Sequence, residues 1–169
     1  LTGLEDYMNR APEGQKTFWY LSAPNREAAR LSPHLERFRK KGIEVLFLYE
    51  PVDEFVMEGL GTYKEWNFKA VENAADDALD AFADKENETP SVTPLSEDDS
   101  RSFDDLLKRI KEILGDRVTD VRISHRLADS PAVLVSPDGG MTSSMEKLFR
   151  AMHKDDSVPV KALELNRDH

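Results

Sequence analysis

The chain contains no cysteine among its 169 residues. This absence excludes disulfide bonds, zinc sites with thiolate ligands and cysteine nucleophiles, and it fits a reducing compartment most easily. No run of about 18 apolar residues could span a membrane, and no charged start followed by an apolar stretch reads as a secretory signal. We therefore expect no membrane partner.

Motifs for small-molecule chemistry are also missing. The eight glycines are dispersed, and neither a GxxxxGK[ST] loop nor a GxGxxG loop is present to hold phosphate groups. The four histidines lack HExxH or comparable spacing, and no GxSxG turn presents a serine nucleophile. The residues therefore predict no catalytic residue, no cofactor-binding residue and no metal ligand.

The net charge of −10 argues against a nucleic-acid partner, and its distribution along the chain is uneven. Residues 71–105 carry 2 basic and 12 acidic side chains, whereas the segments on either side are nearly balanced. Few large apolar side chains occur in residues 73–100, so we predict a solvated acidic linker there. An acidic docking tail for a basic partner is the alternative interpretation.

Before this linker, strand patterns alternate with helical segments. Residues 17–21, 43–49 and 68–71 read as strands, and the second of these is apolar on both faces apart from Glu44. Such a pattern is typical of a strand covered by helices on both sides. Short connections between strand and helix favour right-handed parallel crossovers. Residues 1–72 are therefore predicted to form a small three-layer αβα unit with a short parallel sheet.

After the linker the pattern changes. A helix over residues 103–114 is indicated by apolar residues at helical spacing, and Gly115 ends it. The alternating pattern at residues 119–127 predicts a strand with one buried face, with which residues 132–135 can pair, and residues 161–165 offer a last strand. Residues 101–169 are therefore predicted to be a helix-plus-antiparallel-sheet unit, and the fold class of the chain is α/β plus α+β.

One further helix, near residues 141–152, carries an apolar stripe rich in methionine. Its members fall at i, i+4, i+7, i+8 and i+11: Met141, Met145, Leu148, Phe149 and Met152. Spacing alone favours a helix packed on its sheet. Methionine, however, also suits surfaces that re-pack around varied partners. The spacing does not decide between core and binding surface.

Two long runs of the chain resemble a known family. The run GQKTFWYLSAPNREAARLSPHLERFRKKGIEVLFLYEPVDEFVMEGL, followed after the linker by LGDRVTDVRISHRLADSPAVLV, MTSSMEKLFRAM and LELNRDH, is similar to the ninety-kilodalton heat-shock chaperones. The resemblance is strongest to the bacterial HtpG and mitochondrial branches, of which we favour the mitochondrial one. It covers nearly the whole chain except the linker.

The resemblance implies a domain organisation. Residues 1–72 correspond to the end of the family's middle domain, 73–100 to the linker, and 101–169 to the start of a C-terminal domain without its dimerisation helices. The parent is a homodimer that uses ATP and magnesium, and its nucleotide domain and catalytic arginine find no counterpart here. We therefore expect a monomeric fragment with no ATPase activity and no cofactor of its own, in the mitochondrial matrix or alternatively the cytoplasm.

The resemblance also implies a site. In the family, the amphipathic helix of the C-terminal domain contacts client proteins, and Met141, Met145 and Phe149 occupy matching positions. These three residues are the predicted client-binding residues, whereas Leu148 and Met152 are expected to face the sheet. The predicted function is a client-binding and interdomain-coupling fragment of an ATP-dependent folding chaperone, whose partners are unfolded or partly folded proteins.

Two other functions stay open on the residues alone. One is a free-standing α/β enzyme with its site at the carboxyl ends of the parallel strands, near residues 22–25 and 50–51. A strongly perturbed carboxylate or histidine in a deep pocket there would favour it. The other is a purely structural interaction module, which full burial of the methionine stripe would favour.

Overall fold

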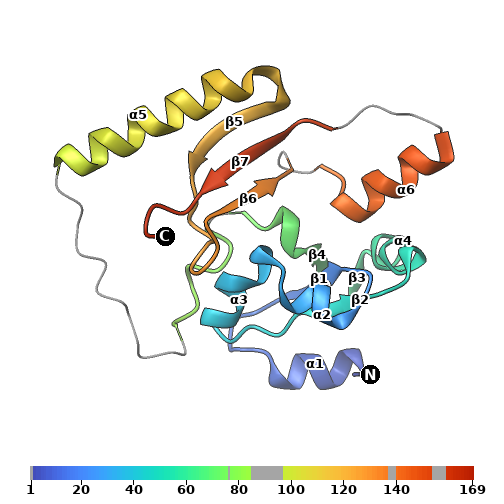
Figure 1. The fold of residues 1–169 in the computed structure, drawn as a ribbon. Coiled ribbons are helices and arrows are strands. Elements are labelled where there is room, and N and C mark those ends of the chain that lie inside the picture. The colour runs from blue at the N-terminus through green and yellow to red at the C-terminus, as the bar shows by residue number, and fades with distance from the viewer. Residues whose placement is uncertain (1, 76, 85–96, 137–139, 154–158) are drawn as a thin grey trace.

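The computed structural model describes residues 2–75, 77–84, 97–136, 140–153 and 159–169 and shows two units, each built on its own sheet (Figure 1). The elements of the first unit are α1 (Leu4–Arg10), β1 (Thr17–Ser22), α2 (Arg26–Arg30), η1 (Pro33–Leu35), α3 (Glu36–Lys40), β2 (Leu46–Leu48), α4 (Pro51–Leu60), β3 (Thr62–Tyr63), β4 (Trp66–Ala70) and η2 (Val71–Asn73). Those of the second unit are α5 (Glu97–Leu114), η3 (Gly115–Arg117), β5 (Val118–Ile123), β6 (Ala132–Val135), α6 (Ser143–His153) and β7 (Lys161–Leu165). The predicted fold class, α/β plus α+β, is confirmed.

The first sheet has the strand order β2-β1-β4-β3. Strand β1 is parallel to both of its neighbours, with Tyr20 opposite Leu46 of β2 and Ala70 of β4. The parallel sheet is therefore as predicted. The antiparallel hairpin of β3 and β4 was not predicted, and its turn places Lys64 and Glu65 at positive φ.

Strand β1 is buried on both faces, because helices cover each side of the sheet. On one face the Trp19 ring packs against Phe38 of α3, with 5.0 Å between ring centroids. On the other face Phe18 packs against Tyr7 of α1, with ring centroids 5.2 Å apart. These two layers of side chains make the predicted αβα arrangement.

The predicted solvated linker is in part packed on the first unit. Leu79 is only 1% exposed and belongs to the Trp19 cluster, against which Ala74, Ala78 and Phe82 also pack. Asp80 forms an ion pair with Arg37, and Asp84 lies 3.2 Å from Lys41. The acidic residues thus face basic residues in α3 and directly after it, while the apolar residues between them cover the core. Residues 85–96 lie outside the described part of the chain, and α5 begins at Glu97, within the predicted linker range.

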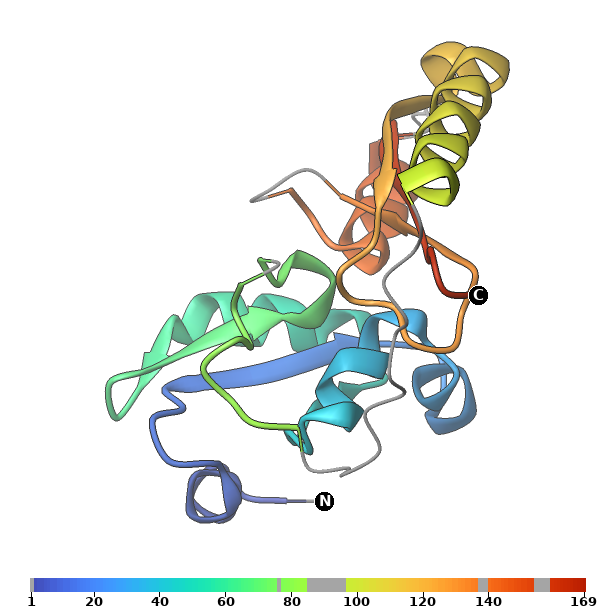
Figure 2. The same ribbon diagram turned by 90° about the vertical axis from the view of Figure 1, so that its left-hand side faces the viewer.

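The second sheet has the order β5-β7-β6. The C-terminal strand β7 lies in the centre, parallel to β5 and antiparallel to β6. The predicted direct pairing of residues 119–127 with 132–135 is therefore wrong, since β7 inserts between these strands. Helix α5 packs along β5 (Figure 2). Within the described residues, no helix is long and apolar enough to cross a membrane.

Replacing Leu79 by alanine tests whether the acidic segment belongs to the core. Because the side chain is buried among aromatic and aliphatic groups, Leu79→Ala is expected to lower the free energy of unfolding by about 2–5 kcal/mol. Urea unfolding followed by circular dichroism measures this loss. The matched control is Leu31→Ala, since Leu31 is 82% exposed and its loss should change stability by no more than about 0.5 kcal/mol. Equal, small effects of both changes would contradict the packing described above.

Candidate functional site at the junction of the two units

The methionine helix α6 lies beside α4 of the first unit (Figure 1). It begins at Ser143, where the Thr142 hydroxyl oxygen accepts a hydrogen bond of 3.2 Å from the Met145 N–H. This is the usual role of a threonine N-cap. The start of the helix is thus defined by Thr142.

Two glutamates of the first unit bind the start of α6. Glu72, in η2, accepts hydrogen bonds from the Ser143 N–H at 2.9 Å and from the Ser143 hydroxyl at 2.7 Å. Glu54, on α4, accepts a hydrogen bond from the Thr142 hydroxyl. Carboxylates at a helix N-terminus also interact favourably with the helix dipole. The first unit therefore sets the position of α6.

Glu54 is almost completely buried. Burial raises the pKa of its carboxyl group, hydrogen bonds from Thr142 and Ser22 offset part of this rise, and the nearby Glu72 adds to it. Its second oxygen, Oε1, has no hydrogen-bond partner among the described residues. Burial is thus the main cause of the raised pKa of Glu54.

Glu36 of α3 makes the largest set of contacts across the junction. Its carboxylate accepts hydrogen bonds from the backbone N–H groups of Ala128 at 2.6 Å, Asp129 at 2.9 Å and Ser130 at 3.1 Å, and from the Ser130 hydroxyl. Burial alone would raise the pKa of Glu36, but the hydrogen bonds from Ser130 and from the three N–H groups together lower it. The loop before β6 is therefore bound to the first unit.

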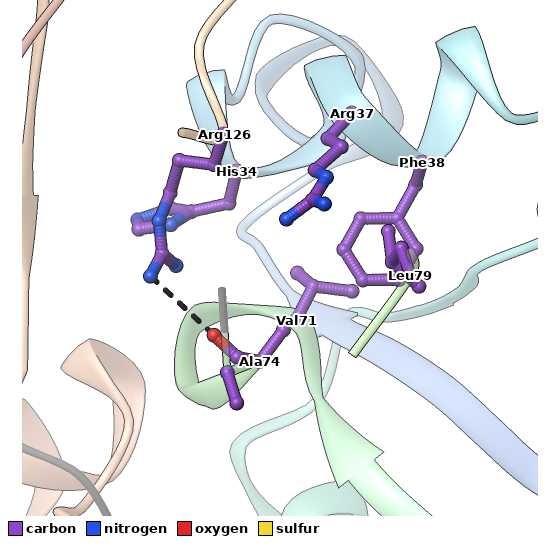
Figure 3. A pocket seen from close by; sticks show the side chains of 8 residues that line it. His34, Arg37, Phe38, Val71, Ala74, Leu79 and Arg126 are labelled. Atoms are coloured by element: carbon purple, nitrogen blue, oxygen red, sulfur yellow. Dashed lines mark hydrogen bonds between the residues drawn. The ribbon is translucent and has the colours of Figure 1, made fainter. Parts of the chain in front are cut away.

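Arg126 bridges both units on the other side of the junction (Figure 3). Its guanidinium group donates to the buried carboxylate of Glu164 at 2.9 Å and to the Ala74 carbonyl at 3.4 Å. The adjacent cavity of about 10 Å³, partly lined by His34, has room for about one water molecule. Burial lowers the pKa of His34, and the positive charge of Arg126 acts in the same direction. This cavity is too small for a ligand.

The structure separates the three predicted client-binding residues. Met141 and Phe149 are 47% and 38% exposed, whereas Met145 is only 4% exposed. The expectation that Met145 offers an accessible surface is wrong in this arrangement, because Met145 lies on the inward side of α6. Met152 is 68% exposed, contrary to the expectation that it faces the sheet. Leu148 is half-buried.

Sequence reasoning missed an exposed apolar face on α4. The exposed residues of this face are Val52, Phe55, Val56 and Leu60. On the inward side of the same helix lies Glu54, which is buried and binds Thr142. The apolar residues of α4 have a spacing that also suits a buried helix, so only the contacts of the folded chain reveal that this face is open.

A groove of about 860 Å³ lies between α6 and the carboxyl edge of the first sheet. Its lining residues are Leu21, Ser22, Ala23, Pro24, Ala28, Leu31, Ser32, Pro33, Tyr49, Glu72, Ser143, Ser144, Lys147 and Leu148. Neither Glu54 nor His34, whose pKa values are perturbed, is among them. In the described part of the chain, no three His, Cys, Asp or Glu side chains are placed to hold a metal ion.

Comparisons with known proteins identify relatives over the whole chain. The family model described as Hsp90 protein matches residues 1–169. Chaperone protein HtpG of Nitratidesulfovibrio vulgaris and that of Oleidesulfovibrio alaskensis are each 58% identical over 169 residues, which is 100% of this chain and 26% of each relative. Chaperone protein HtpG of Geobacter sulfurreducens is 41% identical over 166 residues, 98% of this chain and 25% of the relative. The chain thus spans about a quarter of the length of these relatives.

These matches correct two predictions. The relatives are bacterial, so the mitochondrial branch and the mitochondrial matrix are not supported. The prediction that the chain is not an enzyme, because the nucleotide domain and the catalytic arginine are absent, is contradicted: the family model and the first two relatives match the whole chain. Since the full chain matches the family, that prediction is withdrawn.

The Glu36 carboxylate gives the junction a testable pH dependence. Because hydrogen bonds lower its pKa in the folded protein, its contribution to stability is present above the pKa of the unfolded chain and is lost as the pH falls through the folded pKa. We expect Glu36→Gln to lower the free energy of unfolding by about 1–3 kcal/mol at pH 7, and the difference from wild type to shrink in acid.

Urea unfolding at a series of pH values measures this difference, with Glu27→Gln on the exposed surface of α2 as the control. A difference between wild type and Glu36→Gln that is the same at every pH would contradict the assigned role of the carboxylate.

Proposed function

Because the chain belongs to the Hsp90 protein family, we propose that it serves a protein-folding chaperone by binding non-native client proteins on an exposed apolar surface formed by α4 and α6. We name this the α4–α6 surface, and it consists of Val52, Phe55 and Val56 on α4 with Met141, Phe149 and Met152 on and beside α6. The observation that carries the proposal is the exposure of these six side chains on, or directly before, two neighbouring helices from the two units.

The chemistry of the α4–α6 surface suits weak and broad recognition. Large exposed apolar patches on a protein usually mark interaction sites. Methionine side chains are flexible and polarizable, so they adapt to apolar groups of different shape. Burial contributes about 25 cal/mol per Å² as a guide, and the costs of association and ordering offset much of it. The proposed result is reversible binding of many partly folded chains.

The contacts of the junction support the interdomain-coupling part of the proposal. Glu54 on α4 binds Thr142 at the start of α6, and Glu72 binds Ser143 next to it. A movement of one unit relative to the other would therefore change how the two halves of the α4–α6 surface face a client. We propose that the units are the end of a middle domain and the start of a C-terminal domain, a placement supported by the sequence resemblance and by the two separate sheets.

For the whole chaperone, the resemblance suggests a homodimer that uses ATP and magnesium in the cytoplasm, and these remain proposals. The described residues offer no three-ligand metal site, and the larger groove contains a single lysine without a phosphate-binding loop. A purely structural module is not favoured, because the methionine stripe is only partly buried.

Suppression of client aggregation tests the α4–α6 surface. Phe149→Glu and Met152→Glu place charge on exposed positions, so both proteins are expected to fold and to suppress the aggregation of a partly unfolded model client several-fold less than wild type. Light scattering of the client during heating measures this. Ile113→Glu is the matched control, since Ile113 is an exposed apolar residue on α5, outside this surface.

Met145→Glu is expected to behave differently, because the change places a charge at a buried position and destabilises the protein. Equal suppression by wild type, Phe149→Glu and Met152→Glu would overturn the proposed function.

A further inference from the structure

We propose that the groove between α6 and the first sheet binds an extended apolar peptide segment that carries an acidic residue at one end. This inference goes beyond the proposed client-binding function, because it assigns a second binding surface and the class of peptide segment that it takes. The groove is a different surface from the α4–α6 surface, since none of the six residues of that surface lines it.

The position of the groove in the fold favours a binding site. Strands β1, β2 and β4 are parallel, so their carboxyl ends lie at one edge of the sheet, and the residues that follow them, Ala23, Tyr49 and Glu72, all line the groove. From β1 the chain passes to β2 on one side of it, and then returns to β4 on the other side of β1. In open α/β sheets, ligands bind at the carboxyl edge where the strand order reverses in this way.

The lining of the groove is mainly apolar. The side chains that supply this character are Leu21, Ala23, Pro24, Ala28, Leu31, Pro33, Tyr49 and Leu148. Leu31 is 82% exposed, which is unusual for a large aliphatic group and marks the rim of the groove as apolar surface open to a partner. The volume of about 860 Å³ lies within the range of about 300–1,000 Å³ that is typical of ligand sites.

Two hydroxyl groups make the groove suitable for a peptide backbone. Ser32 lies on the wall from the first unit and Ser144 on the wall from α6, and neither hydroxyl makes a hydrogen bond to another described residue. An extended chain brings backbone N–H and C=O groups that need partners when they leave water. Serine hydroxyls can donate and accept, so they can serve both kinds of backbone group.

The charges of the lining favour an acidic group on the peptide. Glu72 already accepts two hydrogen bonds from Ser143, and its carboxylate is buried. Lys147 is exposed and has no ion-pair partner among the described residues. A carboxylate near Lys147 therefore finds an opposite charge, whereas a lysine there meets a like charge. For an exposed pair, this difference is about two- to fivefold in affinity at low salt.

Fluorescence anisotropy with the whole 169-residue chain tests the proposal. The probe is a fluorescein-labelled synthetic peptide of alternating leucine and serine that ends in aspartate, and the comparison peptide ends in lysine. We expect the aspartate peptide to bind about two- to fivefold more tightly, and Lys147→Glu to reverse this preference. Lys108→Glu, an exposed lysine on α5, is the control and should leave the preference unchanged.

Filling the groove tests the location of the peptide. Ala28→Trp is expected to weaken binding of both peptides at least tenfold. If Ala28→Trp proves unfolded by thermal melting, Leu31→Glu provides a second variant, because Leu31 is exposed. Three results would overturn the proposal. They are unchanged binding by the folded groove variant, equal binding of the two peptides by wild type, and no binding by wild type.

Aggregation suppression by the same groove variants separates this inference from the proposed function. Loss of peptide binding with client suppression retained supports the groove as a separate peptide site beside the α4–α6 surface. If wild type binds the aspartate peptide in the groove but changes on the α4–α6 surface do not affect suppression, the proposed function fails while the groove assignment stands.

Discussion

Three buried carboxylates of the first unit, those of Glu36, Glu54 and Glu72, bind backbone and hydroxyl groups of the second unit. A buried carboxylate is costly unless hydrogen bonds stabilise it, and an unpaired backbone N–H is costly for the same reason. The carboxylates of the first unit and the N–H and hydroxyl groups of the second unit therefore meet each other's need for a hydrogen-bond partner across the junction. The position of α6, and with it the arrangement of the proposed binding surfaces, depends on these contacts.

This constraint explains why the methionine stripe is divided. With Thr142 bound to Glu54 and Ser143 bound to Glu72, α6 turns Met145 inward and leaves Phe149 and Met152 accessible. The same placement forms one wall of the groove and brings α6 into contact with α4. A single helix thus contributes to both proposed surfaces.

Local pattern predicts much of the fold, and non-local contacts account for what it misses. The both-sided apolar run at residues 43–49 correctly indicates a strand of the parallel sheet, but the strand covers only Leu46–Leu48 and lies at the edge of the sheet. The central place of β7 is not visible, since alternation defines the faces of a strand and not its neighbours. Leu79 lies among acidic residues and reads as solvated, yet it completes the core. Likewise, helical spacing identifies the stripe of α6, but only Glu54 and Glu72, far away in sequence, determine that Met145 faces inward.

Hydrogen–deuterium exchange of the junction amides tests this account most directly. The N–H groups of Ala128, Asp129 and Ser143 all donate to glutamates of the first unit, and not to a carbonyl group of a sheet or helix. If the carboxylate contacts hold the two units together, these amides exchange as slowly as those of central strand β1, because opening requires the units to separate. Exchange at the rate of an unprotected loop, with β1 still protected, would show that the units are not joined in this way.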